Sequence, residues 1–511
     1  MAERTTLLGV DVGATGCKAT LYDLDGRIVR RGYAEYGMSS PRPSWVEENA
    51  DDWWQATVAS VRCVTADSAL AKTIAGVGVG CTNALVAVDA RGEPLRPAIM
   101  QLDQRTVPQA DWLREAVGES NLFAVTGNRV APGSYSAPII LWLKEHEPEI
   151  FRAAHKFLVP SGFIAHKLTG RFSMDYSRGS TTALFDIRRR AWSDALCETA
   201  GIPRDKLPDL YESWQVVGGV TAAAAHLTGL PEGTPVVAGC MDTVGAAVGS
   251  GAVLPGESFA ILGTVARVAV ALDEPRFDDR FINCCHAVPG QWVALSVSNG
   301  AGVSLRWFRD QFGHLEVALG REMGQDHYDL LTAQAAKSPP GAAGLIYLPY
   351  IAAERSPIWD PYARGVFFGL TVGHRRGDII RAMMEGVALS IRHNTRILEE
   401  SVGARIAKLP TGGGCARSAL WDQIIADVTG HTIVTLRAPE TETLGTAILA
   451  GVGTGAYGSF ADARERTLSL EEEFAPRAEY AALYDDLFDL YTKLYEDLRP
   501  RFAQAARLPQ R

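Results

Sequence analysis

The chain has 511 residues, of which 47% are hydrophobic and 21% charged, a composition typical of a globular protein. This length exceeds what one hydrophobic core can serve, so we expect two domains of roughly 250 residues each. The formal net charge of −9 argues against nucleic acid or an anionic membrane as the main partner, because both repel a negatively charged surface.

The sequence carries no pattern typical of export or of insertion into a membrane. Its N-terminus lacks a basic region followed by an apolar core, and no uninterrupted run of about 18 apolar residues exists. Eight cysteines are present, but none forms a C-x-x-C pair and their spacing matches no zinc site. We therefore expect a cytoplasmic protein with reduced thiols and no membrane partner.

The first stretch with recognisable chemistry is residues 7–18. Leu7–Val10 are apolar and predict a buried strand, which runs into a turn of small residues carrying Asp11, Thr15 and Lys18. Backbone N–H groups in such a turn suit phosphate oxygens, Lys18 can neutralise their charge, and Asp11 can hold a cation. The alternative is a tight hairpin in which the Asp and the Lys occur by chance.

Two segments supply candidate ligand contacts. Residues 74–79 predict a buried strand, and Thr82 and Asn83 follow its carboxyl end, where open α/β sheets bind ligands. Asp103 and Arg105 follow a turn marked by proline and could hold hydroxyl groups. For this second pair, a surface ion pair is the alternative interpretation.

A single carboxylate, Asp242, follows the apolar strand predicted at residues 235–239. Small residues come after it and predict a helix, so a helix cap is one role open to this side chain. Its sequence neighbours offer it no charged partner, which favours a general base over a member of an ion pair.

The opening pattern is repeated in the second half of the chain. Residues 254–257 form a linker-like turn, residues 258–264 repeat the strand and turn, and residues 265–272 predict the return strand. Thr264 takes the place of Thr15 in this second phosphate-type turn, so the two halves share a pattern although few residues are identical.

A third turn rich in glycine, Gly412–Gly414, precedes a predicted helix over 419–428. Its N–H groups and the positive end of the helix dipole would again face a ligand. Two longer helices are predicted nearby, one capped by Gly377–Asp378 and a C-terminal one that stops at Pro500.

These motifs occur in the order found in the FGGY carbohydrate kinases, which the chain resembles over nearly its whole length. The motifs are Asp11-x-Gly13-x-Thr15-x-x-Lys18, Asp242, Gly263-Thr264, Asn299-x-x-Gly302 and Gly412-Gly413-Gly414. The segment from Glu354 to Ala388 looks most like the xylulokinase branch.

The resemblance implies an α/β fold of two ribonuclease-H-like domains of the actin and hexokinase type, with a nucleotide cleft between them. The N-terminal domain, residues 1–253, would bind the sugar and carry the first phosphate turn. The C-terminal domain, residues 254–511, would bind ATP and its adenosine.

The same resemblance implies ATP and Mg²⁺ as cofactors and gives each candidate residue a role. Asp242 would be the general base for the sugar hydroxyl, and Asp11 and Asp242 would be the metal ligands. The substrate would contact Thr82, Asn83, Asp103, Arg105 and Asp242. The nucleotide would contact Gly13, Thr15, Lys18, Gly263, Thr264, Gly302, Arg306, Gly413, Gly414 and Ser418.

The implied function is ATP-dependent phosphorylation of a sugar hydroxyl, with a ketopentose such as xylulose as the first candidate. The chain departs from the xylulokinases at Cys81–Ala84, where they usually carry Gln-Met-His-Gly. Another ketose or polyol therefore stays open as the substrate, among them L-xylulose, ribulose, erythritol and glycerol.

A function of another class is a non-catalytic, sugar-responsive ATPase on the same fold, which would bind or hydrolyse ATP without depending on sugar. A nicotinamide-dependent dehydrogenase is disfavoured, because residues 9–13 lack the G-x-G-x-x-G spacing. The expected partner is a small-molecule sugar or polyol, and no nucleic acid is expected. The oligomeric state is open, with a homodimer as one candidate.

Overall fold

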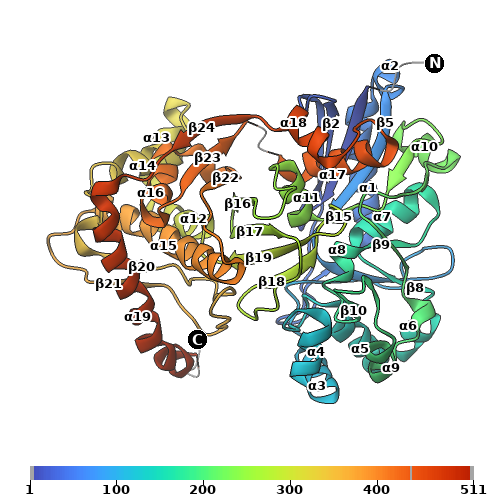
Figure 1. Cartoon of the computed structure of the whole chain (residues 1–511), viewed down its shortest axis with the longest axis horizontal. Helices are drawn as coiled ribbons and strands as arrows, with labels where there is room; N and C mark the ends of the chain where they lie inside the picture. Colours follow the sequence, from blue (N-terminus) through green and yellow to red (C-terminus); the bar gives the residue numbers. More distant parts are fainter. Residues whose placement is uncertain (1–4, 438–439, 507–511) are drawn as a thin grey trace. The chain divides into compact units, whose positions relative to one another are not determined.

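The computed structural model describes residues 5–437 and 440–506 (Figure 1). The chain forms two compact units, each built from segments that are separate in the sequence. The first unit comprises the residues up to Pro255, Ala271–Ala294 and Glu440–Leu468. The second unit comprises Gly256–Val270, residues 295–437 and the residues from Ser469 onward. The division into domains of residues 1–253 and 254–511 stays a prediction.

The first unit is built around a sheet whose strands lie in the order β13-β14-β5-β1-β2-β3, with β15 also pairing with β5. Strands β14, β1 and β15 all run parallel to β5, whereas β2 and β3 continue the sheet as antiparallel neighbours. The bounds are β1 (Thr6–Val12), β2 (Gly16–Asp23), β3 (Ile28–Glu35), β5 (Ile74–Cys81), β13 (Val216–Gly219), β14 (Pro235–Val237) and β15 (Cys240–Met241).

The sheet of the second unit repeats this succession of pairings. The strands β17-β16-β22-β23-β24 correspond in order to β2-β1-β5-β14-β13 of the first sheet. In each series the first and last pairs are antiparallel and the two pairs between them are parallel. In both sheets a hairpin is the first pair of this series, β1 with β2 and β16 with β17, so the structure confirms the repeated pattern of strand, turn and return strand. The bounds are β16 (Ser258–Leu262), β17 (Ala266–Leu272), β22 (Lys408–Gly412), β23 (Thr432–Leu436) and β24 (Leu470–Phe474).

Helices and short strands complete the first unit. Its helices are α1 (Ala50–Thr65), α2 (Ser68–Ala71), α3 (Val107–Val117), α4 (Glu119–Thr126), α5 (Ser136–His146), α6 (Pro148–Ala153), α7 (Pro160–Thr169), α8 (Tyr176–Gly179), α9 (Asp194–Ala200), α10 (Ala222–Thr228), α11 (Asp242–Gly249), α17 (Thr441–Thr454) and α18 (Phe460–Thr467). Its remaining strands are β4 (Glu47–Glu48), β6 (Ala84–Val88), β7 (Ala98–Met100), β8 (Lys156–Leu158), β9 (Ser173–Asp175), β10 (Phe185–Asp186), β11 (Ala191–Trp192), β12 (Asp209–Tyr211) and β18 (Ile282–Cys285).

The second unit carries fewer and longer helices. They are α12 (Gly302–Phe312), α13 (His314–Met323), α14 (His327–Ala335), α15 (Arg376–Val402), α16 (Ala419–Thr429) and α19 (Ala481–Ala505). A short hairpin joins β20 (Ile346–Leu348) to β21 (Val366–Phe368). Strand β19 (Trp292–Ser298) contributes residues to both units.

Two helix boundaries differ from the sequence predictions. Helix α15 begins at Arg376 rather than at the predicted Gly377–Asp378 cap, because Asp378 reaches back to accept the backbone N–H of Arg375 at 2.7 Å. Helix α19 runs past Pro500 to Ala505, although Pro500 was predicted to end it. A proline removes one N–H donor, but it does not by itself stop a helix whose buried face, here continuing to Phe502, is still packed.

No described helix is both long enough and apolar enough to cross a membrane. All eight cysteines are free, and six of them are buried.

Helices α11 and α17 approach each other closely in the first unit, since each carries glycine at the contact. A Cβ atom at Gly445 would lie 1.8 Å from the carbonyl oxygen of Gly245, well inside the van der Waals limit. Asp242 is the first residue of α11, so this contact also fixes the helix that carries the candidate base.

We predict that Gly445→Ala lowers the free energy of unfolding by about 3 kcal/mol, because the two helix backbones must separate to admit one methyl group. Chemical denaturation of the purified protein measures this difference. Gly458→Ala is the matched control, since the nearest atom to a Cβ there is Asp462 Oδ2 at 3.7 Å, an ordinary contact. Equal stability of the two variants would contradict the prediction.

Candidate functional site

The hairpin between β1 and β2 carries the predicted phosphate turn of the first unit. The N–H of Gly13 donates to the carbonyl of Gly16 at 3.0 Å and closes the turn. Asp11 pairs with Lys18 across the two antiparallel strands; Asp11 is buried, whereas Lys18 and Thr15 are exposed. The turn therefore offers an exposed cation and hydroxyl beside a carboxylate at its base.

Asp11 and Asp242 lie at the carboxyl ends of two strands that flank β5. In the register of the sheet, Asp11 lies opposite Gly80 on one side, and Cys240 lies opposite Gly80 on the other. Asp242 comes two residues after Cys240, so both carboxylates are at the same edge of the sheet. Thr82, at the end of β5, lies at this edge too.

Two carboxylates at one sheet edge fit Mg²⁺, which prefers hard oxygen ligands and keeps several waters or phosphate oxygens of its own. Among the described residues no group of three or more His, Cys, Asp or Glu side chains could hold a metal ion. The donors provided by Asp11 and Asp242 therefore suit an ion that is shared with a phosphate ligand rather than one enclosed by the protein.

Asp242 occupies the first turn of α11 and is only half buried. Its Oδ1 accepts hydrogen bonds from the N–H of Thr243 at 2.7 Å and from the Thr243 hydroxyl at 3.1 Å. The positive end of the helix dipole also favours the ionised carboxylate there. The residue before it, Met241, is the N-cap, so Asp242 is not the cap itself.

The sequence gives Asp242 no charged neighbour, but the fold provides one in Arg178. The two residues interact electrostatically, although 64 positions separate them in the chain. Asp175 and Ser177, just before Arg178, also belong to this part of the site, because the Ser177 hydroxyl accepts the N–H of Met241 at 2.9 Å. None of the three could be predicted from the sequence, since a segment reading Asp-x-Ser-Arg looks like an ordinary helix start.

Asp103 and Arg105 form an ion pair in which Arg105 Nη2 donates to Asp103 Oδ2 at 2.7 Å. Arg105 also donates to Glu47 at 2.7 Å, and its guanidinium lies 3.7 Å from the ring centre of Trp45. The pair is buried, so the alternative of a surface ion pair is wrong about its location. The role of both residues as sugar contacts stays a prediction.

Thr82 and Asn83 are held by neighbouring segments of the first unit. The Thr82 hydroxyl accepts a hydrogen bond from Gln101 Nε2 at 3.1 Å, and Asn83 Nδ2 donates to the carbonyl of Ser134. These bonds orient both side chains at the end of β5. Their predicted contact with a sugar stays a prediction.

The second unit contains a pocket of about 430 Å³ that collects most of its predicted nucleotide residues. The predicted residues in its lining come from three loops that are far apart in the sequence. They are Gly263, Thr264, Gly302, Arg306, Gly414 and Ser418. Gly413 lies next to this lining with φ +97°, a conformation that favours glycine.

Hydrogen bonds join these loops directly. The N–H of Gly302 donates to Gly263 O at 3.0 Å, the N–H of Val303 donates to Thr264 O at 3.1 Å, and Arg306 Nη2 donates to Thr264 Oγ1 at 2.5 Å. The start of α12 is thereby fixed to the turn between β16 and β17. This arrangement places the Arg306 guanidinium beside the turn, where a cation suits anion binding.

Several residues in this pocket could not be predicted from the sequence. Tyr328, Asp329 and Thr332 come from α14, and Trp421 comes from α16. In the sequence they read as ordinary members of amphipathic helices, so no local signal distinguishes them. The flat Tyr328 and Trp421 rings and the carboxylate of Asp329 give this pocket a wall suited to a polar aromatic ring such as a nucleobase.

Glu354 supports the loop that leads into α12. Its carboxylate accepts the Ser298 hydroxyl and the N–H of Asn299, both at 2.6 Å, and the N–H of Arg355 at 2.9 Å. Burial raises the pKa of Glu354 to about 7, against the lowering effect of these hydrogen bonds. The folded protein thus binds a proton at Glu354 at a pH where the unfolded chain does not.

We predict that the stability of the wild-type protein relative to Glu354→Gln falls as pH rises from about 4.5 to 7. A raised pKa in the folded state favours folding below the ordinary pKa, and this benefit is lost as pH rises through the folded value. The change is on the order of 3 kcal/mol. Denaturant titrations of both proteins at several pH values measure it, and a constant difference across this range would contradict the shift.

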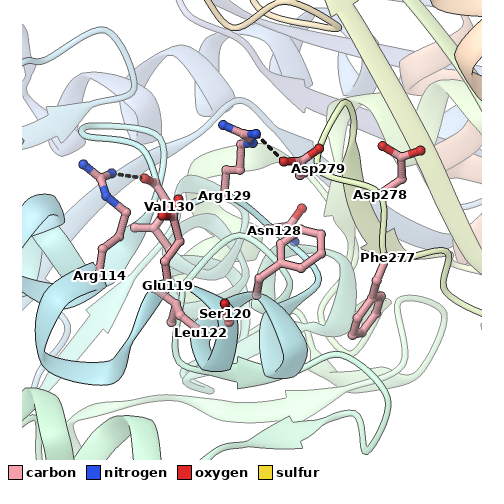
Figure 2. A pocket seen from close by; sticks show the side chains of 11 residues that line it. Arg114, Glu119, Ser120, Leu122, Asn128, Arg129, Val130, Phe277, Asp278 and Asp279 are labelled. Carbon is pink, nitrogen blue, oxygen red and sulfur yellow. Dashed lines mark hydrogen bonds and ion pairs between the residues drawn. The ribbon is translucent and has the colours of Figure 1, made fainter.

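A second pocket, of about 450 Å³, lies in the first unit between α4 and residues 277–279 (Figure 2). An ion pair between Arg129 and Asp279 spans it, and Arg114 donates to the carbonyl of Val130 at 2.8 Å. None of the predicted site residues lines this pocket. Because its lining contains none of these residues, we do not include it in the candidate site.

Comparison with known proteins adds an independent measure of likeness. The profile of the FGGY family of carbohydrate kinases, N-terminal domain, matches residues 6–249, and that of the C-terminal domain matches residues 259–454. The xylulose kinase of Bacillus subtilis is 32% identical over 96% of this chain and 96% of its own length. The gluconokinase of Bacillus licheniformis is 30% identical over 98% of this chain and 97% of its own length.

A solved structure agrees in fold. The xylulose kinase from Rhodospirillum rubrum superposes with a TM-score of 0.86 at 30% identity, covering 98% of this chain and 100% of that one. The predicted α/β fold of the actin and hexokinase type is thereby confirmed.

Proposed function

Because the chain belongs to the FGGY family of carbohydrate kinases, we propose that it transfers the terminal phosphoryl group of ATP to a hydroxyl of a ketopentose such as xylulose. The sequence resemblance to this family is confirmed, and the chain is a sugar kinase. The identity of the sugar is supported by the xylulose kinases among its relatives.

The observation that carries the proposal is the position of Asp242. This carboxylate is half exposed at the end of β15, on the same sheet edge as Asp11 and Thr82. An alcohol is a weak nucleophile, so a carboxylate within reach must accept its proton as the bond to phosphorus forms. In our proposal Asp242 takes that proton, while Thr82 and Asn83 orient the sugar.

The remaining predicted residues bind and align the nucleotide. Gly13, Thr15 and Lys18 would contact phosphate oxygens, and Thr264 and Arg306 are also predicted to do so. The pocket lined by Gly414 and Ser418 would take the adenosine. Phosphoryl transfer depends mainly on such positioning and on neutralisation of charge, because the transition state is loose.

Mg²⁺ would be held by Asp11 and Asp242, and when bound it would neutralise charge on the phosphates. Lys18, opposite Asp11 across the hairpin, adds a second positive charge at the same turn. Together these groups would favour transfer to the sugar.

Gluconate is the second candidate substrate, since gluconokinases are also among the relatives. Gluconate carries a carboxylate, and binding it calls for a cation with a free donor. Among the described residues predicted to contact the sugar, the only cation is Arg105, which already pairs with Asp103 and Glu47. This arrangement favours a neutral sugar.

An assay of ADP formation with D-xylulose, L-xylulose, ribulose, gluconate, erythritol and glycerol tests the proposal. We expect the highest kcat/KM with a ketopentose and at least about tenfold less with gluconate, a difference of about 1.4 kcal/mol. A higher kcat/KM with gluconate or a polyol would contradict the proposal that the substrate is a ketopentose. ATP hydrolysis that does not respond to any sugar would instead support a sugar-responsive ATPase.

A further inference from the structure

The buried guanidinium of Arg178 lies at the strand ends that precede the predicted sugar and base residues. Only 1% of Arg178 is exposed, and its Nη2 donates to the carbonyl of Cys81, the last residue of β5. Cys81 pairs with Met241 in the register between β5 and β15. Thr82 follows Cys81 and Asp242 follows Met241. Arg178 therefore contacts the chain where the segments carrying Thr82 and Asp242 begin.

The residue next to Arg178 holds the other strand. The Ser177 hydroxyl accepts the N–H of Met241 at 2.9 Å and donates to Asp175, which also accepts the backbone N–H of Arg178 at 3.2 Å. Residues 175–178 thus contact the ends of both β5 and β15. A shift of this short segment would move Thr82 and Asp242 together.

The charge of Arg178 is retained although the side chain is buried. Burial alone would lower the pKa of Arg178, but Cys81, Asp242 and Asp175 outweigh it, and the pKa is raised. The thiols of Cys81 and Cys240 are themselves neutral, because burial raises their pKa values. The compensating charges are therefore the carboxylates of Asp175 and Asp242.

Packing alone does not account for an arginine at this position. A buried guanidinium loses its hydration, and the Nε of Arg178 has no hydrogen-bond partner among the described residues. A methionine would fill similar volume without that cost. At 1% exposure the side chain also cannot contact a sugar, so its effect must pass through its neighbours.

We propose that Arg178 is a positioning residue for phosphoryl transfer, whose charge and donor group hold the Asp242 carboxylate and the Thr82–Asn83 segment in one fixed arrangement. This inference rests on the proposed function, in which Asp242 accepts the proton and Thr82–Asn83 orient the sugar. Arg178 is not among the predicted site residues, but in this proposal it sets the positions of both Asp242 and the Thr82–Asn83 segment.

The kinetic test compares Arg178→Met, which removes the charge, with Arg178→Lys, which keeps it. We expect kcat of R178M to fall about 10²-fold while KM for ATP stays within about twofold, because the nucleotide residues are untouched. R178K should recover about tenfold in kcat, since it restores a charge and one donor. A fall in kcat that R178K does not relieve, or no fall at all, would overturn the proposal.

Arg381→Met is the matched control for loss of a buried guanidinium. Arg381 is 3% exposed, belongs to α15 of the second unit, and its Nε donates to Glu385 Oε1 at 2.8 Å; neither residue is among the predicted site residues. We expect R381M to lower the midpoint of thermal unfolding but to keep its kcat when assayed well below that midpoint. Loss of kcat in R381M equal to that in R178M would overturn the positioning role.

A double-mutant cycle with Asp242→Asn measures the charge coupling without using turnover. Thermal unfolding in EDTA is compared for wild type, R178M, D242N and the double variant. If Arg178 balances Asp242, R178M lowers the midpoint less in the D242N background, where that negative charge is gone. Equal shifts in both backgrounds would overturn the coupling. Because the cycle measures stability and not turnover, it tests the coupling between Arg178 and Asp242 even if Asp242 proves not to be the base.

Discussion

Asp242→Asn is expected to lower phosphoryl transfer to the sugar by about 10²–10⁴-fold, the usual effect of losing a general base. Asparagine keeps the shape of the side chain but cannot accept the proton of the attacking hydroxyl. Asp242 begins α11 in the first unit, whereas the pocket predicted to take adenosine is lined by residues of the second unit. Binding of ATP should therefore persist in the variant.

A coupled assay of ADP formation measures turnover, and calorimetric titration with a non-hydrolysable ATP analogue measures binding. Asp194→Asn is the matched control, because Asp194 is likewise the first residue of a helix in the first unit but is exposed and is not among the predicted site residues. Near-normal turnover of D242N would remove Asp242 from its proposed role. Loss of turnover in D194N as well would show that the assay reports damage to the unit rather than to the base.

Local features of the fold followed from the sequence because they depend on neighbouring residues. The apolar run Leu7–Val10 with its small-residue turn gave the hairpin of β1 and β2, and the same pattern at Ser258–Thr264 gave that of β16 and β17. Asn49 caps α1 by accepting the N–H of Asp51 at 3.3 Å. In each case the hydrogen bonds join residues close in the sequence.

Features that depend on contacts between distant segments could not be predicted from the sequence. Nothing around Arg178 in the sequence indicates that it interacts with Asp242, because β5, β9 and β15 come together only in the folded sheet and its neighbours. The burial of Asp103 and Arg105 likewise depends on Glu47 and Trp45, which lie more than fifty residues earlier. Sequence patterns and composition describe one segment at a time, so they do not show which distant residues are in contact.

The nucleotide pocket combines both situations. Its glycines at positions 263, 302 and 414 are visible in the sequence as motif residues, since glycine marks close backbone approach, and the structure lines one pocket with all of them. Tyr328 and Trp421 complete that pocket from helices whose sequences give no sign of it. Among these residues Gly302 offers the most direct test of nucleotide binding in this pocket, because a backbone atom limits the space for a side chain at this position.

Gly302→Ala is expected to weaken ATP binding by about 1–3 kcal/mol, the usual cost of overpacking. A Cβ atom at this position would lie 2.6 Å from Gly263 O and 2.9 Å from Cys415 Sγ, so the turn carrying Thr264 must move away from α12. That movement breaks the bond between the Gly302 N–H and Gly263 O and displaces Thr264 from Arg306.

Calorimetric titration with ATP, and with the sugar alone, measures the two affinities for Gly302→Ala. We expect only the first to fall, because the predicted sugar residues belong to the first unit and Gly302 to the second. Gly373→Ala is the control within the same unit, since the nearest atom to a Cβ there is Thr371 Oγ1 at 3.6 Å. Wild-type affinity for ATP in G302A would mean that the turn between β16 and β17 does not hold the nucleotide.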